Sequence, residues 1–232
     1  MKSTRFAIVV LLALAASSTA RAADWNYRFT PYLWATGLSG TEGFAGRPFE
    51  VDASFGDLLE VLDIGLASHL EADNGTWGWF GDVFYAKLSD DVNLPVATLD
   101  GETKQTIAEA GLTYRLSESI EALGGLRYQK SDSRLSVAGV GALNADEDWV
   151  DGFVGMRWSS DLNDRWGFSV RGDVGAGDSD LVWHVYTGIE YRISDRSSLV
   201  AGYRYLDTDY ENDGFTWDIV QSGLGLGYTF NW

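Results

Sequence analysis

The last ten residues of the chain, Gly-Leu-Gly-Leu-Gly-Tyr-Thr-Phe-Asn-Trp at 223–232, decide how the rest of the sequence is interpreted. Successive side chains of a β-strand point to opposite faces, so this stretch separates into two sets. One set is apolar and aromatic and consists of Leu224, Leu226, Tyr228, Phe230 and Trp232. The other is small or polar and consists of Gly223, Gly225, Gly227, Thr229 and Asn231. The first face suits lipid and the second suits a crowded interior, which is typical of a strand in a transmembrane β-barrel.

The same alternation recurs along the chain and predicts an all-β fold, a single antiparallel transmembrane β-barrel of about ten strands. The expected strands are 24–37, 63–73, 76–88, 104–116, 119–131, 147–158, 165–176, 181–193, 198–208 and 216–232. Each is long enough, because tilted strands need roughly 9–11 residues to cross the hydrocarbon. Short periplasmic turns alternate with longer outer loops, and an even strand number keeps both termini on the periplasmic side.

Eight or twelve strands remain open at this point, because three further segments have strand character. They are 49–55, 92–99 and 135–140, which would extend hairpins above the membrane if they are not separate crossings. A short helix is expected at 57–62, in the first long loop, with Asp57 near its N-terminus.

Residues 1–22 have the organisation of a cleavable signal peptide. Lys2 and Arg5 precede an apolar run at 6–16, and Ala20-Arg21-Ala22 has the A-x-A form of a cleavage site. The apolar run is too short to span a bilayer as a helix. We therefore expect cleavage after Ala22, one barrel domain at 23–232, and a location in the outer membrane of a Gram-negative-type bacterium.

Composition and charge exclude several classes of function. The chain has no cysteine, which excludes disulfides, thiolate metal sites and cysteine nucleophiles. Without the signal peptide it carries 14 basic and 34 acidic residues, a formal charge of −20. Such a surface repels phosphate backbones, so nucleic acid is not an expected partner.

The strand parity places a balanced set of charges on the inward face. Its members are Arg28, Glu71, Asp82, Glu109, Arg115, Glu121, Arg127, Asp151, Arg157, Arg171, Asp173, Glu190, Arg192 and Arg204. Isolated charges in a narrow lumen are costly, whereas a balanced set can pair. Hairpin geometry predicts Arg115 opposite Glu121, and Glu190 diagonal to Arg204. We interpret the set as a plug-like salt-bridge network, with a selective channel lining as the alternative.

The outer loops carry the excess of acidic residues. These are Glu42, Glu50, Asp52, Asp57, Glu60, Asp90, Asp91, Asp100, Glu102, Asp132, Asp146, Glu147, Asp209, Glu211 and Asp213. Carboxylate oxygens suit divalent cations, which would also bridge to lipopolysaccharide phosphates, but no calcium-loop motif occurs. A solvated loop surface is the favoured interpretation, and no cofactor or metal site is predicted.

Two histidines offer the only general bases that titrate near neutral pH. His69 and His184 both fall on the inward face, and Ser68 beside His69 points to the opposite face. Asp180 and His184 would share a face near the outer rim and are the weak catalytic candidates. No G-x-S-x-G, H-E-x-x-H or phosphate-loop motif is present, so an enzyme is not the expected class.

Several motifs spread along the chain together carry a family resemblance. They are Thr30-Pro31-Tyr32-Leu33-Trp34 with 37–40, then 54–59, 81–85, 148–151, 171–175 and 202–207. With these, the chain resembles a family of uncharacterised bacterial outer-membrane β-barrel proteins. The resemblance implies a barrel and an outer-membrane location, implies no catalytic residues, and suggests that the stretch 55–62 is a regular feature at the barrel mouth.

These observations favour a structural barrel or one that admits narrow polar solutes. The alternatives are a lipid- or peptide-directed enzyme using His184 with Asp180, and a surface protein that binds cations or other ligands through its acidic loops. The expected partners are outer-membrane lipids, lipopolysaccharide, and the assembly machinery that would recognise the C-terminal strand ending in Trp232.

Overall fold

The structure is a computed structural model that describes residues 25–44, 46–94, 97–137 and 141–232. The predicted signal peptide at 1–22 lies outside the described residues. Among the described residues, no helix has the length and hydropathy that a membrane-spanning helix needs.

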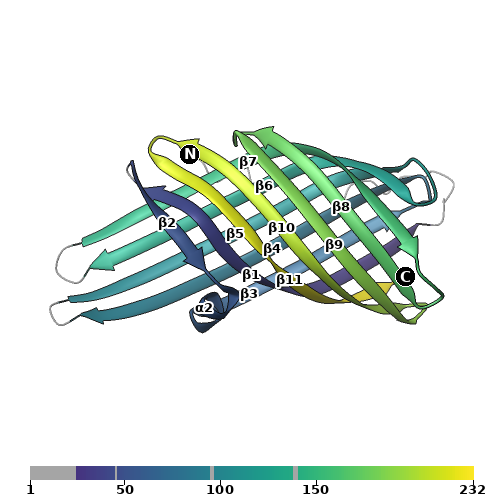
Figure 1. Ribbon diagram of the computed structural model, residues 1–232, viewed down its shortest axis with the longest axis horizontal. Helices are drawn as coiled ribbons and strands as arrows, with labels where there is room; N and C mark the ends of the chain where they lie inside the picture. The colour runs from purple at the N-terminus through teal and green to yellow at the C-terminus, as the bar shows by residue number, and fades with distance from the viewer. Residues whose placement is uncertain (1–24, 45, 95–96, 138–140) are drawn as a thin grey trace.

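The described chain forms a closed antiparallel barrel of ten strands with one additional strand, β2, on its outer end (Figure 1). The strands are β1 (Asn26–Phe44), β2 (Arg47–Ala53), β3 (Leu62–Asp73), β4 (Trp77–Leu94), β5 (Ala97–Arg115), β6 (Ile120–Val137), β7 (Gly141–Asp161), β8 (Trp166–Gly177), β9 (Leu181–Ser194), β10 (Ser197–Asn212) and β11 (Phe215–Asn231). From β3 to β11 each strand pairs with the next, β1 pairs with both β2 and β3, and pairing of β1 with β11 closes the barrel. The prediction of an antiparallel barrel of about ten strands is confirmed.

Three of the expected long loops are hairpin extensions. The β4–β5 ladder continues to Leu94 and Ala97, and the β6–β7 ladder continues to Val137 and Gly141. Figure 1 shows these four strands projecting well beyond the others, at the end opposite the C-terminus. The segment at 49–55 contributes to β2, which pairs with the upper part of β1. These segments have strand character because they continue or add to ladders, and they do not add membrane crossings.

The short helix α2 (Phe55–Glu60) lies where a helix was expected, two residues earlier. Its start is set by a capping box: the Asp57 N–H donates to Ser54 Oγ at 3.3 Å, and the Ser54 N–H donates to Asp57 Oδ2 at 2.8 Å. Such reciprocal bonds satisfy donors that a helix N-terminus otherwise leaves free. None of its residues is buried, so α2 lies on the outside of the barrel.

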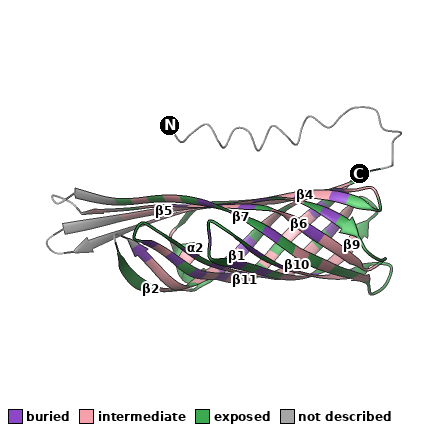
Figure 2. Cartoon of the chain, turned by 90° about the horizontal axis from the view of Figure 1, so that it is seen from above, coloured by how far each residue is buried: buried purple, intermediate pink, exposed green. Residues whose placement is uncertain are grey.

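The outer wall carries an apolar band between two aromatic girdles. Exposed leucines occupy the band; Leu33 is 71% exposed. At the end of the short turns, Trp77 packs on Tyr114 with 4.6 Å between ring centroids. At the other end, Trp183 packs on Tyr205 at the same centroid distance. Lipid-facing apolar side chains flanked by aromatic rings are typical of outer-membrane barrels. Figure 2 shows exposed and buried positions alternating along these strands, because side chains point in turn to lipid and lumen.

Candidate functional site

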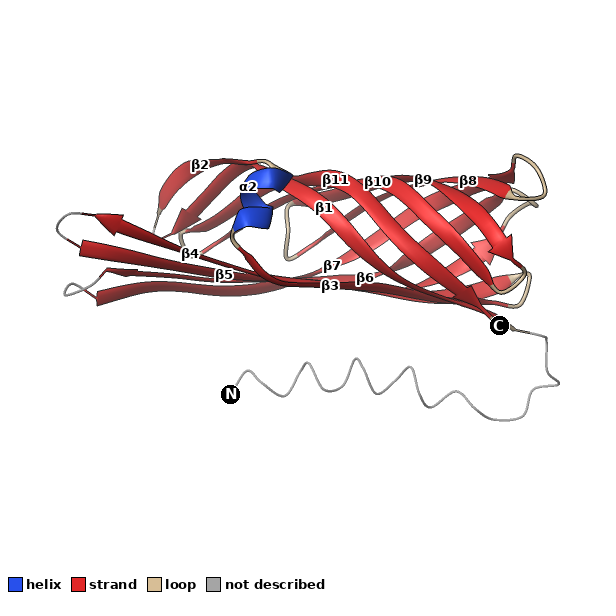
Figure 3. Cartoon of the chain, turned by 90° about the horizontal axis from the view of Figure 1, so that it is seen from below, coloured by secondary structure: helices blue, strands red, loops and turns tan. Residues whose placement is uncertain are grey.

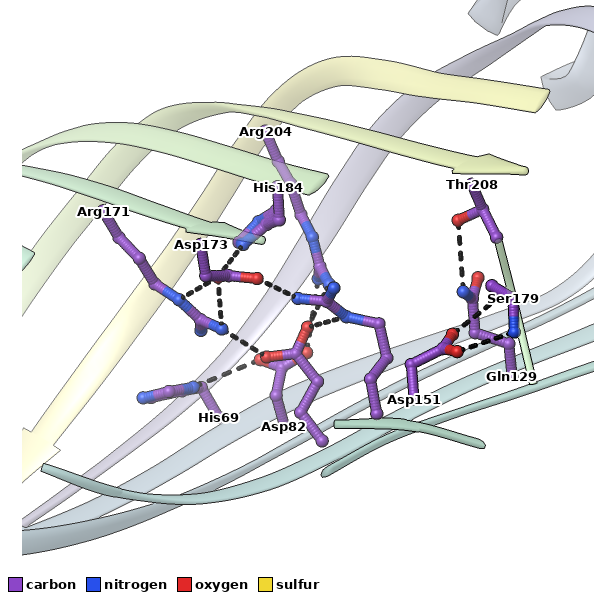
Figure 4. Close-up of polar contacts among 12 residues, drawn as sticks. His69, Asp82, Gln129, Asp151, Arg171, Asp173, Ser179, His184, Arg204 and Thr208 are labelled. Carbon is purple, nitrogen blue, oxygen red and sulfur yellow. Dashed lines mark hydrogen bonds and ion pairs between the residues drawn. The ribbon is translucent and has the colours of Figure 1, made fainter. Parts of the chain in front are cut away.

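The middle of the lumen is filled by a cluster of charged side chains from six strands, which we call the charge knot. Its members are Asp82, Glu109, Arg127, Arg171, Asp173, His184 and Arg204. Figure 4 shows most of them converging from opposite walls. Strand parity points each one inward, where acidic and basic side chains form ion pairs with one another.

Arg127 is the centre of the charge knot and is 0% exposed. Its Nε donates to Glu109 Oε1 at 2.9 Å, and its Nη2 donates to Asp173 Oδ1 at 2.7 Å. The guanidinium also lies 4.9 Å from the centroid of the Phe153 ring. Two charge-assisted hydrogen bonds and an aromatic face offset much of the cost of removing this cation from water.

Two further arginines complete the charge knot. Arg171 donates to Glu109 and Asp173, at 2.8 Å each, and so bridges the same two carboxylates as Arg127. Arg204 donates to Asp82 and Glu109 at 3.3 Å each, which joins β10 to β4 and β5 across the lumen. The lumen is therefore crossed by ion pairs rather than merely lined by them.

A second set of ion pairs lies nearer the short turns, and we call it the rim pairs. Arg157 donates to Glu71 and to Glu121, at 2.8 Å in each case. Arg28 contacts Glu190 at 3.1 Å. The remaining rim pairs are Arg115 with Glu121 and Arg192 with Asp161. Thirteen of the fourteen predicted lumen charges thus make an ion pair. The exception is Asp151, which accepts hydrogen bonds from the N–H and hydroxyl of Ser179.

The structure supports one of the two predicted hairpin pairs and corrects the other. Arg115 is opposite Glu121 in the β5–β6 register, and their side chains lie 3.3 Å apart. Glu190 is opposite Val200, whereas Arg204 is opposite Tyr186. Four positions along a strand correspond to about 13 Å, so Glu190 and Arg204 take other partners.

The predicted dyad of His184 with Asp180 is also corrected. His184 Nδ1 lies 3.0 Å from Asp173 Oδ2, and Asp173 is directly opposite His184 in the β8–β9 register. Asp180 is exposed in the turn before β9, where its N–H donates to the Asp209 carbonyl. Four residues of extended chain place Asp180 about 13 Å from His184, too far for a hydrogen bond. His69, the other histidine, lies between Asp82 and Glu71 at 3.2 and 3.3 Å.

A cavity of about 370 Å³ extends into the barrel from the short-turn end. Its lining runs from Glu118 and Ser119, in a short turn, to Trp34, His184 and Arg204 at the charge knot. Acidic and basic side chains both line it. A space of this kind suits a small polar solute that carries both donors and acceptors.

Two apolar layers close the lumen beyond the charge knot, towards the long hairpins. Along β10 the inward side chains pass from Arg204 to Leu206, then to Thr208, which accepts a hydrogen bond from Gln129, and then to Tyr210. Leu206 belongs to a buried cluster with Trp34, Phe84, Ile107 and Val182. Tyr210 belongs to a second buried cluster with Trp149, Phe215, Trp217 and Ile219.

The acidic loop residues are partly engaged with cations of the chain itself. Glu102 contacts Lys87 at 3.0 Å and Lys104 at 2.6 Å, and Asp146 contacts Lys130 at 2.7 Å. In the part of the chain that the structure describes, no cluster of three or more acidic or histidine side chains is arranged to hold a metal ion. Cation binding by the acidic loops stays a prediction.

Sequence reasoning missed two aromatic contributors to the charge knot. The Tyr32 hydroxyl donates to Asp82 at 2.9 Å, and the Arg204 guanidinium lies 4.7 Å from the centroid of the Trp34 ring. The alternation along β1 already points both side chains inward, so the signal was present, but a search limited to charged residues passes over it.

Comparison with known proteins gives the fold. No protein-family model and no curated protein matches the chain. It is similar to the outer membrane protease OmpT from Escherichia coli, with 7% identity, 93% of this chain and 99% of that chain covered, and a TM-score of 0.51. The chain has the fold of an outer-membrane β-barrel. Other similar structures are Ail of Yersinia pestis (13% identity, 90% and 99% covered, TM-score 0.40) and neisserial surface protein A (13%, 88% and 96%, 0.34).

Proposed function

We propose that this chain is an outer-membrane protein of structural type, with a lumen that the charge knot holds closed to all but narrow polar solutes. The observation that carries the proposal is Arg127, fully buried and bonded to carboxylates from two other strands. The predicted signal peptide, the lipid-facing band and the aromatic girdles support the location. Lipids and lipopolysaccharide are the proposed surroundings, and the C-terminal strand ending in Trp232 is the proposed signal for the assembly machinery.

Energetics favour closure. To open the lumen, the chain must break shared ion pairs: Glu109 contacts Arg127, Arg171 and Arg204, all within 3.3 Å. Breaking a buried pair costs about 3–5 kcal/mol when one charge is left uncompensated. The apolar layers beyond would have to separate as well. A steadily open, water-filled pore therefore does not fit the geometry, whereas the cavity on the short-turn side accepts small solutes without any rearrangement.

Planar-bilayer conductance tests the proposal. The folded wild-type protein is expected to show no persistent large openings. Replacing Arg127 and Arg204 together with Met leaves Asp82, Glu109 and Asp173 with fewer counter-charges, so cation-selective openings should appear. Arg115→Gln, at the exposed rim, is the matched control. Its conductance trace should show no more openings than that of the wild type. Long-lived wild-type openings that pass solutes too large for the 370 Å³ cavity would overturn the proposal.

A further inference from the structure

The barrel wall contains a break in its hydrogen-bonded ladder, between β1 and β3. Pairing of β1 with β3 stops at Pro31, and pairing of β1 with β2 starts at Leu38. On the sides that face each other, residues 32–37 of β1 and 62–67 of β3, all within the described chain, have no paired strand. We call this break the notch. Helix α2 lies beside it, on the outer wall next to β1 (Figure 3).

Exposure along β3 indicates that the notch is not sealed by its own strands. In the wall, buried and exposed residues alternate, but the five residues Leu62–Leu66 are all exposed. Both faces of this half of β3 are therefore accessible. Above the notch, the chain crosses β1 closely, since a Cβ placed on Gly37 would lie 2.9 Å from the Ala53 carbonyl oxygen. The notch thus has an upper limit at the start of α2.

The notch lies within the apolar band, in the half nearer the long hairpins. The ring of Tyr27 stacks on Trp232 in the lower girdle, and the notch begins five residues further along β1. Five residues of a tilted strand rise about 13 Å. On the other edge of β1, the same stretch pairs with Leu224 and Leu226 of β11, each 64% exposed to the lipid side. With the long hairpins outside, the notch faces the acyl chains of the outer leaflet.

Unpaired backbone groups in hydrocarbon are costly, so the expected occupant is one that brings hydrogen-bonding oxygen atoms to this depth. The side chains that flank the notch are apolar: Leu33 on β1, Leu66 on β3, and Phe55 and Leu59 on α2 are all exposed large hydrophobics. The membrane contains acyl chains at this depth, and their apolar surface suits these apolar side chains.

The inner side of the notch holds two buried hydrogen-bond donors that have no partner among the described atoms. They are Nε1 of Trp34 and Nε of Arg204. The Trp34 ring lies against Arg204, 4.7 Å from its guanidinium carbon, and edge-on to Phe84 at 5.1 Å. The cavity from the short-turn end reaches both Trp34 and Arg204. Buried unsatisfied donors call for an acceptor, because each otherwise bears its full desolvation cost.

We infer that the notch is a lateral binding portal for a single-chain acyl amphiphile of the outer leaflet. The acyl chain lies in the notch between Leu33 and Leu66, and its ester or carboxyl oxygen accepts hydrogen bonds from Trp34 and Arg204. The Trp34 indole then separates the lipid-filled notch from the aqueous cavity. This inference rests on the membrane placement made in the proposed function.

Photolabelling tests the portal. The full-length mature protein is folded into phosphatidylcholine vesicles that contain two fatty acids, one with a diazirine beside its carboxyl group and one with a diazirine at the chain end, and labelled residues are mapped by mass spectrometry. The inward-facing Trp34 and Phe84 should carry label, together with the outward-facing Leu224 and Leu226. Label on the outward residues alone would overturn the portal and leave the membrane placement standing. An absence of label on Leu224 and Leu226 would instead overturn the membrane placement itself.

Two variants separate the notch from other routes. Gly65→Phe places a ring in the notch, and a Cβ there meets only Leu62 side-chain atoms at 3.5 and 3.8 Å. Gly172→Phe is the matched control on a continuous part of the wall, because a Cβ there meets nothing within 4 Å. Gly65→Phe should abolish the label on Trp34 and Phe84, and Gly172→Phe should retain it. Equal inward label in both variants would mean entry through the cavity and would overturn the portal.

If Gly65→Phe does not fold, the presence or absence of label on Trp34 and Phe84 in the wild type still tests the portal. A third variant tests the indole N–H of Trp34 as a hydrogen-bond donor. Trp34→Phe keeps an aromatic ring and removes the indole N–H. Loss of one buried hydrogen bond should raise the fatty-acid concentration needed for half-maximal label on Phe84 by about tenfold. An unchanged concentration would show that Trp34 does not donate to the amphiphile.

Discussion

Glu42 should make the outer end of the barrel less stable as the pH rises from about 4.5 to about 7. It lies on β1 beyond the apolar band, opposite Trp217 on β11 and Phe49 on β2. One of its carboxyl oxygens is buried and has no hydrogen-bond partner among the described atoms. Burial raises the pKa of Glu42 from 4.5 to about 7. The neutral acid is therefore the form that the fold prefers.

The sign and size of the effect follow from proton linkage. Between about pH 4.5 and 7 the folded chain holds a proton on Glu42 that the unfolded chain releases. The free energy of unfolding must then fall as the pH rises across this interval and level off above it. At 1.36 kcal/mol per pKa unit, the total loss is about 3 kcal/mol. Glu42→Gln keeps the shape of the protonated side chain and cannot ionise, so it should not show this loss.

Urea unfolding in detergent micelles, at about pH 5 and about pH 8, measures the difference. Wild type should lose about 3 kcal/mol more than Glu42→Gln between the two pH values. Glu50→Gln, at an exposed position of β2, is the control and should follow the wild type. An equal loss in wild type and Glu42→Gln would refute the reasoning, because it would show that Glu42 titrates alike in the folded and unfolded chain.

Three further outcomes follow from the lumen and from α2. Arg127→Met should lower the free energy of unfolding by about 3 kcal/mol, the low end of the cost of breaking a buried ion pair, because Glu109 and Asp173 lose one counter-charge and keep Arg171. Arg192→Met at the rim should cost about 1 kcal/mol or less. Urea unfolding of both variants measures these losses, and an equal loss of unfolding free energy in the two variants would contradict the prediction. His184→Ala should lower the melting temperature, because His184 is hydrogen-bonded to Asp173 within the charge knot. Asp180→Ala should leave the melting temperature unchanged. The opposite result would contradict the pairing of His184 with Asp173. Ser54→Ala should speed amide hydrogen exchange in α2 alone, and unchanged exchange would show that the capping box does not hold the helix.

The faces of the strands could be predicted from the sequence, because a period of two is a local property. The C-terminal strand shows it directly, since Leu224 and Leu226 lie exposed to the lipid side as expected. Arg115 and Glu121 could also be paired in advance, because a short turn between β5 and β6 brings these inward-facing positions opposite each other. In both cases the information lies within a few residues of sequence.

The partners across the lumen could not be predicted in the same way. Parity points Arg204 inward but says nothing of which strands stand opposite, and its carboxylates come from β4 and β5, about a hundred residues earlier. Sequence proximity suggests Asp180, four residues before His184, as its partner, whereas Asp173, its neighbour across the β8–β9 ladder, is closer. The notch could not be predicted from the sequence either, because it depends on the position at which β1 stops pairing with β3 and starts pairing with β2.

The long hairpins determine what the cell would present to its surroundings. The β4–β5 and β6–β7 ladders are joined by pairing of β5 with β6 as far as Leu99 and Val137, so the four strands project as one sheet. In a barrel placed as proposed, antibodies and phages would meet this sheet. Their epitopes would be assembled from neighbouring strands, so immune sera raised against the folded protein should lose recognition once the barrel is boiled in detergent.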